Sequence, residues 1–496
     1  MIAVAVTRPD ASAQQPGPAY SRETITAQVE AADELRSALQ RALDVAEKRV
    51  TLSPRVYRFE GNLDFSDLDG VTIDGQGAEF VFTRGMVRLQ SCRNVTVKNL
   101  FLDVEPLPFV QGTVVALDSQ AKTVDMRLDP GYPAEAACSR KDGLRCVFFD
   151  PKGERELEII DTTTPPPVEV SPGVVRIHSR RIFDVEERPL AAGDRVVLSV
   201  KTGVGGISLT DCANVTLEDI TIYAAGRFAI TENGLAEGGN TYRRCRVVRR
   251  PGSGRLMAGA SDGFHSITQK RGPHLVECEI AHCFDDLVNI HGFFSLAVER
   301  ADNGAWLIAV PGGRDFAVGS LLRFYRAPDA EPLGEARVVV CELRDTPTRE
   351  EIEQRAGEHF KQVCGRTLRS LPHAQACEVT LDREIDLAPF DFVSCADFAG
   401  AGAVIEDCHF HDGHVRGVLT KSSDSVIRGC RFERLARSGV VIKPEIYWLE
   451  GPFPSNVRIE QNTFVDCGFG AVSKVEKSWE FAPLQVISSF SSRLFP

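Results

Sequence analysis

A short strand-like phrase recurs along this chain and constrains its fold more than any other feature. Each copy alternates apolar and polar residues and lies beside Asn, Asp or Gly turn residues. The copies are VTIDGQGAEFVF, CRNVTVKNLFLD, CANVTLEDITIY, YRRCRVV, HLVECEI, AVIEDCHF, SVIRGCRF and NVRIEQNTF. Short strands that repeat at a spacing of about 20 to 50 residues are typical of a solenoid. The sequence therefore predicts an all-β fold, a right-handed parallel β-helix, over the competing β-sandwich.

Two stretches interrupt the repeat, residues 107–201 and 293–395. Both contain longer alternating strands and Pro-rich turns, which favour small antiparallel β-barrels inserted into the solenoid. An amphipathic pattern after residue 23 predicts a helix that caps the open end of the solenoid. The expected organisation is a disordered N-terminus at 1–22, the capping helix and first rungs at 23–106, β-barrel 1 at 107–201, central rungs at 202–292, β-barrel 2 at 293–395, C-terminal rungs at 396–470 and a tail at 471–496.

Charge and hydropathy argue against two classes of partner. The formal net charge is −12 and no long Lys/Arg run occurs, so nucleic acid is not an expected partner. No stretch of about 18 apolar residues exists, so no membrane span is expected. The two inserted barrels offer surfaces on which a homodimer could form.

The 14 cysteines of the chain indicate an interior role. Cys212, Cys245 and Cys278 recur at one constant interval, and in a core Cys behaves as a small apolar residue. We expect these three to be reduced, buried and stacked at equivalent points of successive rungs, with disulfides as the alternative in an exported protein. The absence of any CxxC pair argues against a structural zinc site.

The stretch from Ser261 to Gly292 carries the candidate chemistry. Its polar residues of interest are Asp262, His265, Asp285, Asp286, Asn289 and His291. The separation of Asp262 from Asp286 is roughly one solenoid rung, and neighbouring rungs lie about 4.8 Å apart. Carboxylates this close resist full ionisation, so at least one should have a raised pKa, as acid–base work on a glycosidic bond requires.

Each aspartate motif alone has an ordinary structural explanation, because Asp-Gly often forms a turn and Asp-Asp often ends a strand. Their combination one rung apart, followed by Asn-x-His-Gly, favours catalysis. Asp262 stands alone beside an apolar strand, so burial should keep it protonated and suit it to be the general acid. Asp285 or Asp286 would then be the general base.

Further candidate substrate-binding residues lie near this stretch in the predicted solenoid. An aromatic ring can stack on a sugar face, although a strand-end aromatic is as often core, and charged groups can hydrogen-bond sugar hydroxyls. These candidates are Glu232, Arg416, Lys421, Glu445, Trp448 and Glu450. His409, His411 and His414 alternate along a strand without further residues at ligand spacing, so we expect a surface role for them and no metal.

Five phrases of the chain resemble glycoside hydrolase family 110, the inverting α-galactosidases built on a parallel β-helix with two inserted barrels. The phrases are YRRC from Tyr242, SDGFH from Ser261, FDDLVNIHG from Phe284, RGVLTKSSD from Arg416 and PEIYWLEG from Pro444. The resemblance extends from Leu52 to Gly468. It implies removal of terminal α-1,3-linked galactose from an oligosaccharide or polysaccharide, without metal or cofactor. It also implies acid and base roles for the aspartates that match Asp262, Asp285 and Asp286.

The chain departs from that family at both ends. After Gly468 the repeat dissolves, which indicates a chain short of rungs. The apolar run Met1–Val6 is too short for the core of a signal peptide. Because the family is usually exported, the resemblance nevertheless implies a secreted or periplasmic protein.

Two other functions remain open from the sequence. A polygalacturonase-like hydrolase or a polysaccharide lyase also carries Asp, Asp-Asp and His-Gly on a parallel β-helix, but an acidic sugar would need more cations than Arg416 and Lys421. A carbohydrate-binding solenoid without catalysis is the third candidate, and the presence of all three aspartates argues mildly against it. Cleavage of an aryl α-galactoside, cleavage of a uronide, or binding alone separates the three.

Overall fold

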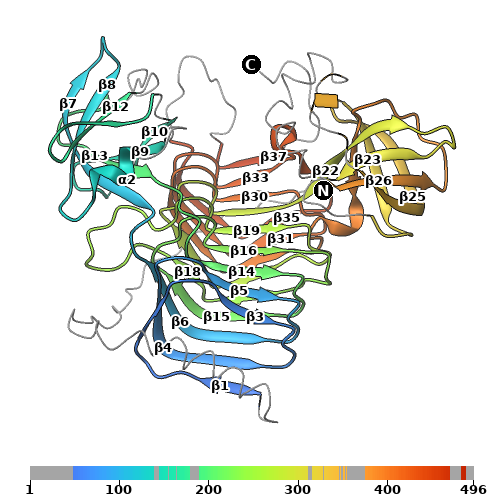
Figure 1. The fold of residues 1–496 in the computed structure, drawn as a ribbon, viewed down its shortest axis with the longest axis horizontal. Coiled ribbons are helices and arrows are strands. Elements are labelled where there is room, and N and C mark those ends of the chain that lie inside the picture. The colour runs from blue at the N-terminus through green and yellow to red at the C-terminus, as the bar shows by residue number, and fades with distance from the viewer. Residues whose placement is uncertain are drawn as a thin grey trace.

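The chain winds into a parallel β-helix in the computed structural model, which describes residues 48–138, 144–154, 156–162, 165–178, 189–310, 316–327, 329–345, 347, 350–351, 354, 375–469 and 482–486. Figure 1 shows the rungs stacked along one axis, with one inserted module on each side. The predicted all-β solenoid is confirmed. The expected disordered N-terminus and capping helix lie outside the described residues. No helix in the described part of the chain is both long and apolar enough to cross a membrane.

Three rows of strands run along the solenoid, and the rungs pair in parallel within each row. The long strands β4 (Thr72–Phe82), β6 (Thr96–Val104) and β15 (Thr216–Ile222) pass through rows one and two. Row one also contains β1 (Arg49–Thr51), β17 (Thr241–Arg243), β20 (His274–Val276), β28 (Val404–Glu406), β31 (Val426–Arg428) and β35 (Arg458–Glu460). Row two contains β2 (Val56–Phe59), β18 (Arg246–Val247), β21 (Glu279–Ala281), β29 (His409–Gly413), β32 (Arg431–Leu435) and β36 (Thr463–Cys467).

Row three positions the candidate chemistry. Its strands are β3 (Leu63–Ser66), β5 (Val87–Gln90), β14 (Ile207–Thr210), β16 (Ile230–Asn233), β19 (Phe264–Ile267), β22 (Val288–Arg300), β30 (Val418–Thr420), β33 (Val440–Ile442) and β37 (Leu484–Val486). The last strand pairs in parallel with β33. Residues 484–486 therefore still belong to the row, and the tail predicted at 471–496 is wrong at this point.

A left-handed turn before row one explains the Asn of the repeated phrase. Asn94, Asn214 and Asn456 have φ values of 53°, 54° and 54°, a region that Asn tolerates better than most side chains. The valine that follows each of them is buried. The Asn-Val pair thus supplies both the turn and the first core contact of a rung.

The first insertion is a seven-stranded antiparallel sheet in the order β10-β9-β13-β7-β8-β12-β11. Its elements are β7 (Phe109–Asp118), β8 (Thr123–Leu128), α2 (Ala134–Cys138), β9 (Arg145–Phe149), β10 (Glu156–Thr162), β11 (Val168–Ser171), β12 (Val174–His178) and β13 (Arg195–Ser199). All four side chains of β11 are exposed, so this end strand adds nothing to the core. The described pairings therefore form an open sheet around one apolar core, rather than the closed barrel predicted.

The second insertion is a closed six-stranded antiparallel barrel. The C-terminal half of β22 joins β23 (Trp306–Val310), β24 (Leu321–Arg326), β25 (Glu331–Arg344), β26 (Gln375–Leu381) and β27 (Phe392–Cys395). The chain then returns to row one through the 3-10 turn η4 (Ala396–Phe398). A second 3-10 turn, η5 (Ile446–Trp448), and the short strand β34 (Glu450–Gly451) follow row three near the barrel.

The cysteines form two ladders rather than one. Cys245 and Cys278 stack with Cys408 and Cys430 at the turn between rows one and two. Cys212 stacks instead with Cys92 after row three. All are free thiols in the structure, and all are buried. The expected burial is confirmed, but the equal spacing in sequence is a coincidence of rung lengths for Cys212.

Glu232 faces the interior of the solenoid, so the predicted contact with substrate is wrong. It lies on β16 two residues after the core residue Ile230, and residues two apart on a strand share a face. Its carboxyl group is fully buried and accepts hydrogen bonds from Tyr242 (2.6 Å), Ser266 (2.7 Å) and Asn240 (2.9 Å). Glu232 is therefore a structural residue with satisfied partners.

Replacing Glu232 by Gln should preserve the free energy of unfolding below pH 4.5, where the wild-type carboxyl keeps its proton, because the amide can accept from Tyr242 and Asn240 and donate to Ser266. Replacing it by Leu leaves three buried polar groups without this partner and should cost about 3 kcal/mol. Urea unfolding followed by circular dichroism measures both changes.

The pH dependence of the same variants gives a second test. Burial raises the pKa of Glu232 above its ordinary value of 4.5, so the folded protein keeps this proton when the unfolded chain has lost it. The wild type should lose stability as the pH rises from 4.5 through the folded pKa. The Gln variant lacks this proton and should lose less, so an equal loss in both proteins would contradict the assignment.

Candidate active site

Three successive rungs place Asp262, Asp286 and Arg416 at one position, two residues before β19, β22 and β30. The backbone confirms the stacking, since the amide of Gly263 donates to the Asp286 carbonyl at 3.1 Å and that of Leu287 donates to the Arg416 carbonyl at 2.9 Å. Neighbouring parallel strands lie about 4.8 Å apart. The solenoid register thus holds two carboxylates and a guanidinium in one column.

Close packing explains why glycine follows Asp262. A Cβ at Gly263 would lie 2.2 Å from Cγ2 of Ile280 and 2.8 Å from the Leu287 carbonyl oxygen. The Asp-Gly pair is therefore not a simple exposed turn. The glycine instead lets the rung that carries Asp262 pack closely against Ile280 and Leu287.

Asp286 is paired with the next rung. The Arg416 guanidinium donates to both of its carboxylate oxygens, at 2.6 and 2.9 Å, and also to Glu445 at 2.6 Å. Burial raises the pKa of Asp286 to about 7, with the charges of Asp285 and Asp262 adding to the rise and Arg416 opposing it.

Asp285 points toward the first insertion. Its carboxylate accepts a hydrogen bond from Arg145 at 2.5 Å, and its side chain is 23% exposed, against 3% for Asp286 and 5% for Asp262. Burial alone would raise the pKa of Asp285, but the Arg145 guanidinium outweighs it and lowers the pKa. Asp285 is therefore the carboxylate that ionises most readily of the three.

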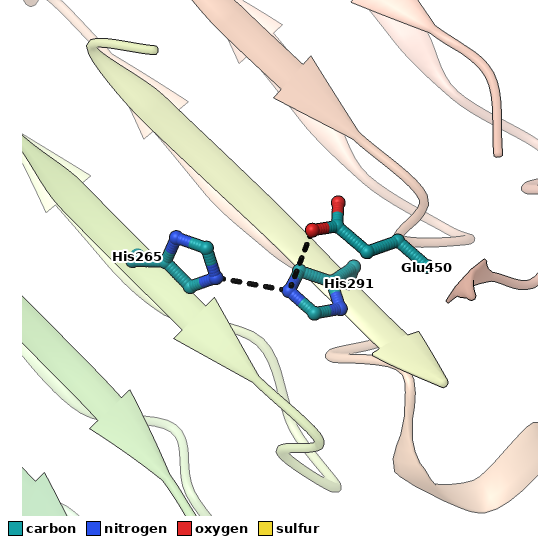
Figure 2. Close-up of side chains that lie close together, drawn as sticks. All are labelled: His265, His291 and Glu450. Carbon is teal, nitrogen blue, oxygen red and sulfur yellow. Dashed lines mark hydrogen bonds and ion pairs between the residues drawn. The ribbon is translucent and has the colours of Figure 1, made fainter. Parts of the chain in front are cut away.

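Asp262 is paired with a histidine rather than an arginine. Its Oδ2 lies 2.5 Å from Nδ1 of His265, and Nε2 of His265 lies 2.9 Å from Nε2 of His291 (Figure 2). Burial raises the pKa of Asp262, and His265 opposes part of the rise. Two of the three aspartates thus have raised pKa values, as predicted, although burial contributes more to the rise than the crowding of carboxylates.

A second ion pair completes the face of row three. Lys421 is fully buried and its ammonium group donates to Glu450 at 2.7 Å and to Asn289 at 2.9 Å. Glu450 also lies 3.7 Å from His291. Burial would raise the pKa of Glu450, but His291, when its ring is charged, and the Lys421 ammonium lower it well below its usual range.

The turn η5 brings Glu445 and Glu450 to this site from its two ends. The backbones of the two glutamates bridge each other in antiparallel fashion. Trp448 lies on the same turn and is 44% exposed, so its ring is available at the surface beside the site rather than buried in the core.

The structure therefore brings together most of the predicted site residues. They are Asp262, His265, Asp285, Asp286, Asn289, His291, Arg416, Lys421, Glu445 and Glu450. It adds Arg145 and Lys443, the latter 3.6 Å from Glu445. Arg145 lies far from Asp285 in sequence, and nothing in its local pattern indicated this contact.

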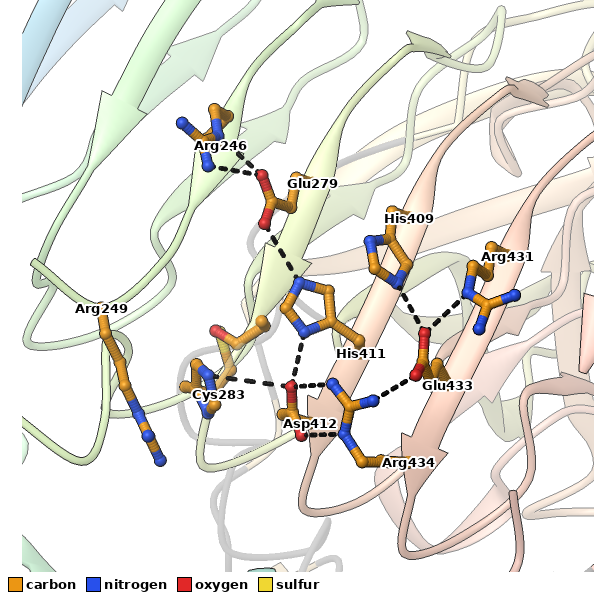
Figure 3. Close-up of polar contacts among 12 residues, drawn as sticks. Arg246, Arg249, Glu279, Cys283, His409, His411, Asp412, Arg431, Glu433 and Arg434 are labelled. Carbon is orange, nitrogen blue, oxygen red and sulfur yellow. Dashed lines mark hydrogen bonds and ion pairs between the residues drawn. The ribbon is translucent and has the colours of Figure 1, made fainter. Parts of the chain in front are cut away.

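Three groups in the described residues bring histidine and carboxylate atoms within 4.8 Å of one another: His265, His291 and Glu450; Glu279, His409 and His411; His282, His411 and Asp412. The carboxylates of these groups already pair with Lys421, Arg246 and Arg434. Figure 3 shows the latter two pairs around His411. A fixed cation repels a second one, so these arrangements do not favour a metal.

The histidines of β29 are placed differently from the prediction. His409 and His411 lie on the outer face of row two, on either side of the core residue Phe410. His414 is buried, so the surface role expected for all three is wrong for His414.

Comparison with known proteins gives two kinds of similarity. Residues 392–482 match the family described as right handed beta helix region. The chain is 23% identical over 500 residues to alpha-1,3-galactosidase A of Bacteroides fragilis strain ATCC 25285, covering 91% of this chain and 76% of that protein. It is 25% identical over 260 residues to alpha-1,3-galactosidase A of Shewanella woodyi, covering 48% of this chain and 41% of that protein.

A further relative is alpha-1,3-galactosidase B of Bacteroides thetaiotaomicron, 24% identical over 249 residues, which are 47% of this chain and 40% of that protein. Among solved structures, the A-module of the Azotobacter vinelandii mannuronan C-5 epimerase AlgE6 aligns with a TM-score of 0.31 and 9% identity. That alignment covers 92% of this chain and 75% of the other.

Replacing Arg145 by Ala should raise the pKa of Asp285 by about one unit or more, because the nearest opposite charge is lost. Replacing it by Lys keeps a charge and should give a smaller rise. Carboxyl NMR with ¹³C-labelled aspartate measures both, with Asp285→Asn identifying the signal. An unchanged pKa in the Ala variant would show that Arg145 does not hold Asp285 ionised.

Proposed function

We propose that this chain is an inverting glycoside hydrolase that removes terminal α-1,3-linked galactose from an oligosaccharide or polysaccharide. One observation carries the proposal. Three aspartates meet on one face of the solenoid, in a chain that aligns over 91% of its length with a protein named alpha-1,3-galactosidase A. The match to phrases of glycoside hydrolase family 110 supports the same conclusion.

The charges of the site suit a neutral sugar. Each of its fixed cations already faces a carboxylate: Arg145 faces Asp285, Arg416 faces Asp286 and Glu445, Lys421 faces Glu450 and Lys443 faces Glu445. Galactose hydroxyls can both donate to these carboxylates and accept from the cations. A uronate would add a negative charge beside five carboxylates, which disfavours the polygalacturonase and lyase alternatives.

The aspartates can divide the acid and base roles of an inverting reaction. The acid protonates the glycosidic oxygen while the base removes a proton from the attacking water on the opposite face of the sugar. Such pairs are about 6.5 to 9.5 Å apart. Asp262, whose pKa is raised, has the property of an acid, and Asp285, which is ionised and partly exposed, has that of a base.

The proposal predicts that a nitrophenyl α-galactoside is cleaved and that matched β-galactosides and α-galacturonides are not. Proton NMR of the fresh product should show β-galactose before mutarotation, because water attacks opposite to the leaving group. Appearance of α-galactose first would contradict inversion. Binding without cleavage would favour the carbohydrate-binding alternative.

Replacing Asp262 by Asn tests the acid role assigned from the sequence. Turnover of a galactosyl disaccharide should fall by about 10²-fold or more, whereas the fall on a nitrophenyl galactoside should be smaller, because that leaving group hardly needs a proton. Equal losses on both substrates would make Asp262 a base. The acid role would then pass to Asp286, whose pKa burial raises to about 7.

A further inference from the structure

Asp262 begins a chain of three short hydrogen bonds that ends on the backbone. Its Oδ2 lies 2.5 Å from Nδ1 of His265, and the two histidine Nε2 atoms are 2.9 Å apart. Nδ1 of His291 lies 2.7 Å from the carbonyl oxygen of Gly292. Figure 2 shows the two rings on adjacent row-three strands, with Nε2 of each aimed at the other.

The carbonyl oxygen at the end of this hydrogen-bond chain determines which nitrogen atoms of the two histidines carry protons. A carbonyl oxygen only accepts, so Nδ1 of His291 must carry a proton. A neutral His291 then has a bare Nε2, and the 2.9 Å contact requires His265 to donate from its own Nε2. One proton remains for the 2.5 Å gap between His265 and Asp262.

The surroundings favour a neutral His291. Its side chain is 2% exposed, and burial lowers its pKa to about 4. The charged groups around this hydrogen-bond chain are Asp285, Asp286, Glu450 and Lys421, together with Arg145 from the first insertion. The other face of His265 stacks on Phe228, with ring centres 4.2 Å apart, and Arg227 lies over that ring.

The type of ion-pair partner sets Asp262 apart and makes this hydrogen-bond chain important. Asp285, Asp286, Glu445 and Glu450 pair with arginine or lysine, residue types that ordinarily carry a charge at neutral pH. Asp262 pairs with a histidine, which can lose its charge there. Asp262 thus differs from the other four carboxylates, because its ion-pair partner among the described residues is a histidine and not an arginine or lysine.

We propose that His291 is a positioning residue that acts through His265: it fixes a proton on Nε2 of His265, so that Asp262 and His265 share a single proton and titrate as one unit. This deepens the proposed function, on which it rests for the catalytic importance of Asp262. It assigns the two histidines a role in proton placement that is distinct from contact with sugar hydroxyls.

Nitrogen NMR of protein labelled with ¹⁵N-histidine tests the proton order without substrate. From about pH 6 to about pH 8, the range in which a free histidine loses its charge, His291 should carry a proton on Nδ1 alone and His265 should carry one on Nε2. His291→Gln and His265→Gln assign the signals. A His291 protonated on both nitrogens would overturn the proposal, as would a bare Nε2 on both rings with one bound zinc per chain.

The pH profile of kcat/KM on a nitrophenyl galactoside tests the consequence. His291→Leu removes the acceptor, so the Asp262–His265 pair should lose its proton more easily and the alkaline limb should move down by about one pH unit. In His291→Gln the amide oxygen can accept from His265, which should restore most of the shift. His274→Gln, the same substitution on row one, should leave the profile unchanged.

An alkaline limb that stays in place in His291→Leu would overturn the proposal, as would an equal shift in His274→Gln. The two experiments separate this inference from the proposed function. The predicted proton order in a protein that cleaves no galactoside would contradict the function alone. Cleavage by a protein with a doubly protonated His291 would contradict the proton chain alone.

Discussion

The register of parallel strands in row three determines the rest of the site. Backbone hydrogen bonds hold β19, β22 and β30 one strand spacing apart, so residues at matching positions cannot separate. Asp262, Asp286 and Arg416 occupy one such position, and His265 and Asn289 occupy another. The carboxylates of Asp262 and Asp286 are therefore close because strand pairing holds them there, although like charges repel each other.

Burying so many carboxylates requires opposite charges nearby, since an isolated buried charge is very costly. The chain supplies them from separate elements: Arg145 from the first insertion, Arg416 and Lys421 from the next rung and Lys443 after β33. Because these cations offset burial to a different extent at each carboxylate, the pKa values of chemically similar aspartates differ. Asp285 is lowered beside a guanidinium, while burial prevails at Asp262 and Asp286.

Local rules explain what the sequence could predict. The Asn-Val phrase encodes a turn and a core contact within a few residues, and Asp262 and Asp286 are separated by one rung with no insertion between them. Predictions failed where rung length or chain direction mattered. The rung from Thr216 to its partner Thr241 is shorter than the next rung, from Thr241 to His274, so a constant interval placed Cys212 in the wrong ladder. Only the tertiary fold brings Arg145 to Asp285, so the sequence could not predict this pair. The inward direction of the Glu232 side chain, in contrast, could have been predicted from its spacing to Ile230.

The strand β22 belongs to two units at once. Its first residues pair with β19 and β30 in row three, and its last residues pair with β23 and β27 in the second barrel. Between them, Gly292 and Phe293 pair with β34, which carries Glu450. The barrel is therefore not joined to the solenoid by a flexible linker. It could not be removed, or replaced by the barrel of a relative, without disturbing row three. Any cut at its N-terminal border severs the strand that carries Asn289 and His291, so the barrel and this part of the site must be inherited together.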